Sequence, residues 1–204
     1  MKSRQRTLLV VILILLSLLL GALVWYYLSV VQPPRSASEG EAENLEHVAS
    51  FYGGSADSTG FVRPARLAVT PEGDLYVSDS SPSVASVYLM GQDGEIERRL
   101  VPTHPFASPQ PVAVWSDGTV WVGDYLLGEI AVFDAQGAEI ARIVHTAPTS
   151  INIVEDRAYV GGVGSVSVYD QNGTLVDTYG VGRGRGEGEL DLPHGALPVE
   201  EDVV

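Results

Sequence analysis

The stretch SDGTVWVGDY, residues 116–125, has two counterparts in the same chain. PEGDLYVSDS begins 45 residues earlier, and VEDRAYVGGV begins 38 residues later. Self-similarity at intervals of about 20 to 50 residues is typical of repeat architectures, in which each unit buries its apolar faces against its neighbours. This period restricts the possible folds more strongly than any single motif in the chain.

The three stretches share residue types at equivalent positions. A glycine and an aspartate recur in the first two stretches, and an aromatic residue recurs in all three. These positions are Gly73 and Gly118, Asp79 and Asp124, and Tyr76, Trp121 and Tyr159. Because they recur with the repeat, we interpret all of them as structural. The aspartates are expected to accept backbone N–H groups of the turn that follows each strand.

Short runs rich in Val, Ile, Tyr and Trp alternate within each period with turn sequences such as EGD, SDG, QDG and QNG. Asp-Gly and Asn-Gly favour tight hairpins, because both central residues of a type I′ turn need positive φ. No segment after residue 45 has the periodicity of an amphipathic helix. These features predict an all-β fold built from four-stranded antiparallel units.

The expected strands are apolar on both faces. In TVWVGD, Val120 and Val122 share one face while Trp121 lies on the other. A sheet of this kind must be covered on both sides. A β-propeller provides such cover, since each four-stranded blade lies between two neighbours around a central channel. We therefore predict a β-propeller.

The units resemble NHL repeats, which form six-bladed propellers. The resemblance covers residues 48–204 and is clearest in GSADSTGFVRPARLAVTPEGDLYVSDS and in YGVGRGRGEGELDLPHGALPVEEDVV. The third unit departs from the pattern, because Gly162 stands where the first two units have aspartate. The resemblance implies little about function, since the family includes scaffolds, ligand-binding domains, lactonases and lyases.

Prolines open four units, at Pro64, Pro109, Pro148 and Pro193, and the last unit stops at Val204 within its second expected strand. About three blades and the start of a fourth would leave sheet faces uncovered. We expect the remaining blades, on the order of 100 residues, to belong to a longer chain. The alternative is a second copy that closes the ring face to face.

The apolar run LLVVILILLSLLLGALVWYYLSVV, from Leu8 to Val31, contains no charge. As a helix it would reach about 36 Å, enough to cross a bilayer core of about 30 Å. It is longer than the apolar core of a cleaved signal peptide, so we favour an uncleaved signal anchor. The basic residues that precede it place residues 1–7 in the cytoplasm and the propeller outside the cytoplasmic membrane, in the periplasm or at the cell surface.

Residues 32–47 are rich in Pro, Ser, Gly and Glu and predict a flexible acidic linker before the propeller at 48–204. All 26 acidic residues follow the apolar run, against 12 basic residues in the whole chain. A surface this acidic repels phosphates, so nucleic acid is excluded as a partner. The chain has no cysteine, which excludes disulfides and cysteine nucleophiles.

His194 is the one candidate metal ligand, and a weak one. The sequence LPHGA places it at the start of an innermost strand, near the channel in which propeller enzymes similar to this family hold a metal. The equivalent positions hold Ala65, Gln110 and Thr149, which make a poor ligand set. We therefore expect no catalytic residue, no metal and no cofactor among these residues.

The preferred hypothesis is a membrane-tethered, extracytoplasmic propeller that binds a protein or a small ligand as a scaffold. No Ser-His-Asp set, pair of catalytic acids or phosphate loop indicates an enzyme. The alternative is a lactonase- or lyase-like hydrolase whose channel metal site is completed by the missing blades. The fold alone does not decide between the two.

Overall fold

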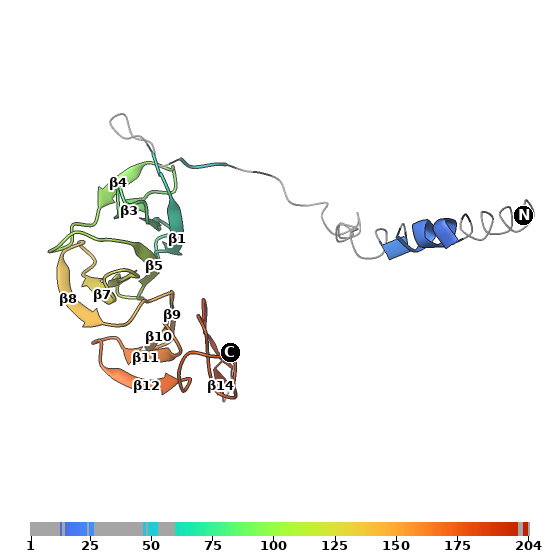
Figure 1. Ribbon diagram of the computed structural model, residues 1–204. Helices are drawn as coiled ribbons and strands as arrows, with labels where there is room; N and C mark the ends of the chain where they lie inside the picture. The colour runs from blue at the N-terminus through green and yellow to red at the C-terminus, as the bar shows by residue number, and fades with distance from the viewer. Residues whose placement is uncertain are drawn as a thin grey trace, which may run out of the picture. The chain divides into compact units, whose positions relative to one another are not determined.

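The computed structural model describes residues 13, 15–23, 25–26, 47, 49–52, 60–199 and 202–203. The chain divides into two compact units, Met1–Ala49 and Ser50–Val204 (Figure 1). In the first unit, residues 15–23 are helical. None of the helical residues described here forms a helix that is both long and apolar enough to cross a bilayer. The rest of the predicted span Leu8–Val31, and the predicted linker up to residue 46, lie outside the described residues.

The second unit contains three four-stranded antiparallel sheets, which we call blades 1, 2 and 3. Blade 1 consists of β1 (Pro64–Val69), β2 (Leu75–Asp79), β3 (Ser86–Met90) and β4 (Ile96–Arg99). Blade 2 consists of β5 (Pro109–Val114), β6 (Val120–Asp124), β7 (Glu129–Phe133) and β8 (Glu139–Val144). Blade 3 consists of β9 (Ser150–Val154), β10 (Arg157–Gly161), β11 (Val166–Asp170) and β12 (Leu175–Tyr179). The predicted four-stranded antiparallel units are confirmed.

The strands of each blade follow their order in the chain, so every blade is a simple meander. The first strands lie next to one another, β1 against β5 and β5 against β9. Figure 1 shows the blades one after another, with β1, β5 and β9 along one side and β4, β8 and β12 along the other. The first strands therefore form the inner edge of the arrangement, and the fourth strands form its outer edge.

The hydrophobic core lies between the blades. One cluster joins blades 1 and 2 and includes Tyr76, Val120 and Phe133. A second cluster joins blades 2 and 3 and includes Trp121 and Tyr169. Val120 and Trp121 are adjacent in β6 and fully buried on opposite faces of blade 2. The prediction that such a sheet is covered on both sides is therefore confirmed for blade 2.

Glycines at the turns permit the short connections between strands. Gly73 and Gly118 have φ of 97° and 85°, in the left-handed region that glycine adopts at little cost. Beyond blade 3, β13 (Pro198–Val199) pairs with β14 (Asp202–Val203) in a short hairpin, where the sequence predicts the opening of a fourth unit. Thr149 Oγ1 donates to the carbonyl of Pro193, which joins this segment to blade 3.

Candidate functional site

The two repeated aspartates hold the segment that leads into each innermost strand. Asp79 accepts backbone N–H groups of Val62 at 2.7 Å and Arg63 at 3.1 Å, and also that of Ser81 at 2.9 Å. Asp124 accepts those of Ala107 at 2.7 Å and Ser108 at 3.1 Å, and those of Leu126 at 3.1 Å and Leu127 at 3.0 Å in the following turn. Both carboxylates are buried. We call this arrangement the aspartate latch, and its bonds give these residues a structural task.

Blade 3 has a different arrangement at the same place. Gly162 replaces the aspartate, and a Cβ there would come within 2.5 Å of the His145 ring. His145 is buried, its Nδ1 has no hydrogen-bond partner among the described residues, and its ring meets that of Tyr169 edge-on at 6.1 Å. Burial lowers the pKa of His145 below its ordinary value, so the ring is neutral at neutral pH. Glycine therefore makes room for an imidazole where a carboxylate would otherwise lie.

The repeated aromatic residues lie in the core. Tyr76 packs between blades 1 and 2, and Trp121 between blades 2 and 3. Tyr159 is only partly buried, on the opposite face of β10 from Ala158 and Val160, which pack against blade 2. The aromatic residue at this repeat position is therefore buried in blades 1 and 2, where the next blade covers it, and only partly buried in blade 3.

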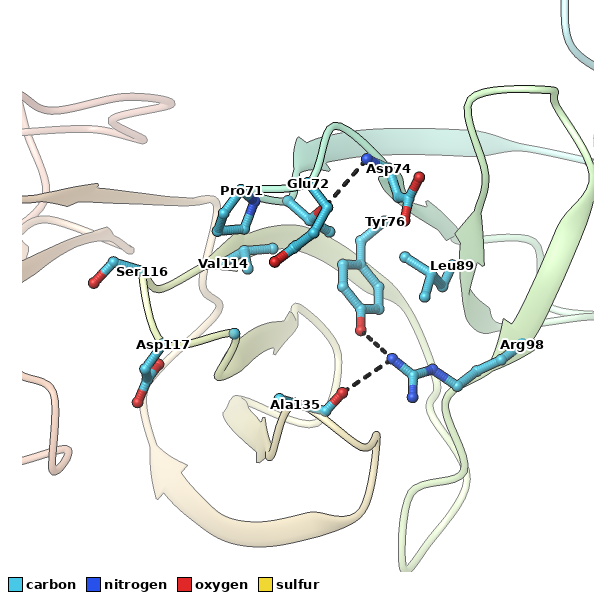
Figure 2. Close-up of a pocket in the computed structure, with 12 residues that line it drawn as sticks. Pro71, Glu72, Asp74, Tyr76, Leu89, Arg98, Val114, Ser116, Asp117 and Ala135 are labelled. Carbon is cyan, nitrogen blue, oxygen red and sulfur yellow. Dashed lines mark hydrogen bonds between the residues drawn. The ribbon is translucent and has the colours of Figure 1, made fainter.

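A pocket of about 360 Å³ lies between blades 1 and 2 at their turn ends (Figure 2). We call it the inter-blade pocket. Its walls come from the β1–β2 turn, the β5–β6 turn and strand β4. Figure 2 shows the ring of Tyr76 at its centre, with Arg98 on one side and Ser116 and Asp117 on the other. Leu89 and Val114 add apolar surface.

Arg98 ties the two blades together inside this pocket. Its Nη2 donates to the Tyr76 hydroxyl at 2.9 Å and to the carbonyl of Ala135 at 3.2 Å, and its Nη1 donates to the carbonyl of Gln136 at 2.7 Å. These bonds use neutral acceptors. The guanidinium has no ion pair with a described residue, so its charge is oriented but not neutralised by a carboxylate.

Three carboxylates line the pocket: Glu72, Asp74 and Asp117. Asp117 accepts the backbone N–H of Thr119 at 2.9 Å and the Gln171 amide at 2.6 Å, and the bond from Thr119 lowers the pKa of its carboxyl below the ordinary value. Neither the Glu72 nor the Asp74 carboxylate accepts a hydrogen bond from a described residue. The lining therefore carries three negative charges against one positive charge, and two of the carboxylates can accept bonds from a ligand.

Arg98 departs from the repeat. In the register of blade 1, Arg98 of β4 lies opposite Leu89 of β3. The equivalent residues of the fourth strands are Ala141 in blade 2, opposite Val132, and Asp177 in blade 3, opposite Val168. The packing of the blades does not require a guanidinium at this position, because the other blades form without one. No sequence motif marks Arg98 or the acids of the β1–β2 turn as functional.

His194 lies away from this pocket. It is exposed and lines a smaller cavity beside β1, β5 and β9, on the inner edge of the blades. Within the described part of the chain, no three His, Cys, Asp or Glu side chains come together as metal ligands. The structure does not bring His194 together with Asp79 or Asp124, whose carboxylates serve the latches.

Comparison with known proteins identifies the fold. No family model and no curated protein matches the chain. Solved structures match it, among them hydrazine synthase of Kuenenia stuttgartiensis, with a TM-score of 0.52 and 22% identity over 65% of this chain and 40% of that one. Virginiamycin B lyase of Staphylococcus aureus gives a TM-score of 0.54 and 14% identity over 69% and 47%.

A nidogen/laminin complex gives a TM-score of 0.54 and 18% identity over 60% and 49%. The fold is a β-propeller. At these identities the likeness shows the fold alone, and the chain spans less than half the length of each of these proteins. The resemblance to NHL repeats in particular stays a prediction.

Proposed function

We propose that this chain is a β-propeller binding module that accepts a cationic side chain of a partner protein in the inter-blade pocket. The observation that carries the proposal is the pocket lining, which holds three carboxylates and one guanidinium, and that guanidinium already donates to three neutral acceptors within the protein. A lysine or arginine side chain of a partner would offset the excess negative charge.

The apolar part of the pocket suits the stem of a long basic side chain. Leu89 and Val114 can cover its methylene groups, since lysine and arginine bury their stems while their charged ends stay near water. The Tyr76 ring can add a cation–π contribution of about 0.5–1 kcal/mol. The chain has a formal net charge of −14, which would speed the approach of a basic partner at low salt.

The test is a titration of the full chain with the blocked tripeptide acetyl-Gly-Lys-Gly-amide at low salt, followed by ¹⁵N NMR. We expect saturable shifts at the amides of Asp74, Tyr76 and Ser116, and none with acetyl-Gly-Glu-Gly-amide. The double variant Glu72→Gln, Asp74→Asn should weaken binding about tenfold, because it removes two carboxylates that would pair with the lysine.

A matched control changes two acids in the corresponding turn of blade 3, Glu155→Gln and Asp156→Asn. These residues lie in the β9–β10 turn, outside the inter-blade pocket. The control should bind the lysine peptide as the parent chain does. Equal weakening by both double variants would mean that net charge, and not this pocket, attracts the peptide, and the proposal would fail.

We also propose that the run from Leu8 to Val31 anchors the propeller to the cytoplasmic membrane, with the propeller outside and the N-terminus inside. Its support is the uncharged sequence and the basic residues before it. Carbonate extraction of cells that express the chain should leave it in the membrane fraction, and external protease should digest the propeller. Release by carbonate would contradict the anchor.

Among the described residues, no cluster of metal ligands is present to support the propeller-enzyme alternative. Stoichiometric metal in the purified full-length protein would revive it.

A further inference from the structure

A second cavity lies on the inner edge of the blades, separate from the inter-blade pocket. It has a volume of about 130 Å³, and its walls come from β1, β5 and β9 and from the segment that precedes β13. We call it the axial cavity. Four polar side chains line it: Arg66, Ser150, Asn152 and His194. No aspartate or glutamate of the described residues does so, although the chain has 26 acidic residues.

Two of these groups have unused hydrogen-bonding capacity. The Arg66 guanidinium donates to the carbonyl of its neighbour Ala65 at 2.9 Å and forms no ion pair with any residue that the structure describes. Ser150 is 6% exposed, and its Oγ has no hydrogen-bond partner in the described part of the chain. A buried hydroxyl without a partner costs about 1–3 kcal/mol, so such a group calls for an explanation.

The polar residues of the axial cavity are not dictated by the repeat. Asn152 pairs with Tyr159, whereas the equivalent pairs in blades 1 and 2 have alanine at this position, Ala68 with Tyr76 and Ala113 with Trp121. The Asn152 amide nitrogen donates to the carbonyl of Ala196 at 3.1 Å, which holds the His194 segment beside β9. At this position the inner strand of blade 3 is thus polar where those of blades 1 and 2 are apolar.

We propose that the axial cavity binds the carboxylate of a small organic acid. Arg66 supplies a planar pair of N–H donors that matches the two oxygens of a carboxylate, and the Ser150 hydroxyl supplies a further donor from β9. His194 lines the cavity from the segment before β13. Because the lining contains a guanidinium and no carboxylate, an anion fits it and a cation does not.

The size of the cavity and the apolar residues in its lining favour a short-chain acid over inorganic phosphate. At about 30 Å³ per water molecule, the cavity holds the equivalent of about four waters, enough for a carboxylate with one or two carbons attached. Leu67, Val112 and Ile151 provide apolar surface for those carbons. Phosphate has oxygen on every side and would leave some of its oxygens against these residues without hydrogen bonds.

The experiment titrates the ¹⁵N-labelled full chain with sodium propionate, with inorganic phosphate and with sodium chloride, at constant pH and ionic strength. We expect propionate to shift the amides of Ser150 and Asn152 saturably and chloride to leave them in place. Arg66→Leu should weaken propionate binding at least tenfold, and Ser150→Ala about threefold. Arg185→Leu, which makes the same charge change on an exposed arginine outside the cavity, should leave binding unchanged.

Three results would overturn the proposal: propionate shifts that do not saturate, tighter binding of phosphate than of propionate at the same amides, or equal binding by Arg66→Leu and the parent chain. If Arg66→Leu does not fold, Arg66→Lys replaces it as the test. It keeps the charge but loses the planar pair of donors, so binding should weaken severalfold. Unchanged binding by Arg66→Lys and Ser150→Ala together would refute the assignment.

Discussion

Replacing Asp124 with asparagine tests whether the aspartate latch stabilises the propeller. The substitution preserves the size of the side chain but removes its charge and one of its two oxygens. Oδ1 accepts from Leu126 and Leu127 in the turn that follows β6, and Oδ2 accepts from Ala107 in the segment that leads into β5. The N–H of Ser108 is shared between the two oxygens. An asparagine whose oxygen takes the place of Oδ1 can keep three of these donors, and its amide nitrogen then faces the N–H of Ala107.

The expected loss of stability follows from these bonds. Leaving one buried N–H without an acceptor costs about 1–3 kcal/mol, and each remaining bond changes from a charged to a neutral acceptor, a loss of about 1 kcal/mol. With three bonds remaining, these effects together predict a loss of about 5 kcal/mol, which is large against a total stability of about 5–15 kcal/mol. Asp79→Asn should cost somewhat less, because Asp79 accepts from three backbone N–H groups where Asp124 accepts from four.

Urea unfolding of the full chain, followed by tryptophan fluorescence, measures this loss. Trp115 and Trp121 are 2% and 0% exposed, so their emission should report the unfolding of blade 2. With an m-value of about 2 kcal/mol/M, Asp124→Asn should lower the midpoint by about 2.5 M. The control is Asp134→Asn, since Asp134 accepts two backbone N–H groups in the exposed β7–β8 turn.

Asp134→Asn should cost about 1 kcal/mol or less, because water can replace an exposed bond. The reasoning is refuted if Asp124→Asn unfolds at the same urea concentration as Asp134→Asn. Such a result would mean that the segment before β5 is held by packing, and that the carboxylate is dispensable.

Three further predictions concern acid stability and the core. Burial raises the pKa of Glu139, but hydrogen bonds from Arg142 and Thr103 outweigh this effect and hold the pKa at about 2. The ionised carboxylate therefore stabilises the fold fully above pH 4.5, and this contribution is lost as pH falls towards 2. In urea titrations, Glu139→Gln should be less stable than the parent chain above pH 4.5, and the difference should vanish towards pH 2. Burial lowers the pKa of His145, so its neutral form stabilises the fold above pH 6.5 and this contribution is lost as pH falls. The melting temperature of the parent chain should therefore decline between about pH 7 and 5, and His145→Leu should make this decline smaller. Trp121→Ala should cost about 3–5 kcal/mol by circular dichroism, and Tyr159→Ala less than half of that, because Tyr159 is only partly buried.

The architecture could be predicted because the repeat and the two-sided strands depend on local sequence. An apolar residue at every position of VWV leaves no face for water, so covered sheets follow from the sequence of β6 alone. The role of Asp124 could be predicted only in part. A following turn is a local feature, but the segment that leads into β5 lies 16 to 17 residues before the aspartate, and only the folded sheet brings it there.

The inter-blade pocket could not be predicted, because it depends on register. The fourth strands of blades 1 and 2 share the sequence E-I-x-R, and aligning this motif places Arg98 on Arg142. The observed pairing places Arg98 opposite Leu89 and Ala141 opposite Val132, so the two arginines occupy different positions. A slip of one residue moves a side chain to the other face of a sheet. The sequence motif therefore conceals the arginine that distinguishes this pocket.

Comparison of the three blades separates structural from functional residues. A residue that recurs at one position in successive blades meets a need that every blade has, as the latch aspartates do. A residue that departs from the repeat has no such explanation, and Arg98 and Asn152 both stand where another blade has alanine. Each of the two residues lines a charged cavity. Arg98 lines the acidic inter-blade pocket, and Asn152 lines the axial cavity, which contains an arginine and no acid. If both ligands bind as proposed, the Glu72→Gln, Asp74→Asn variant should retain propionate binding and Arg66→Leu should retain lysine-peptide binding, because the two cavities share no residue.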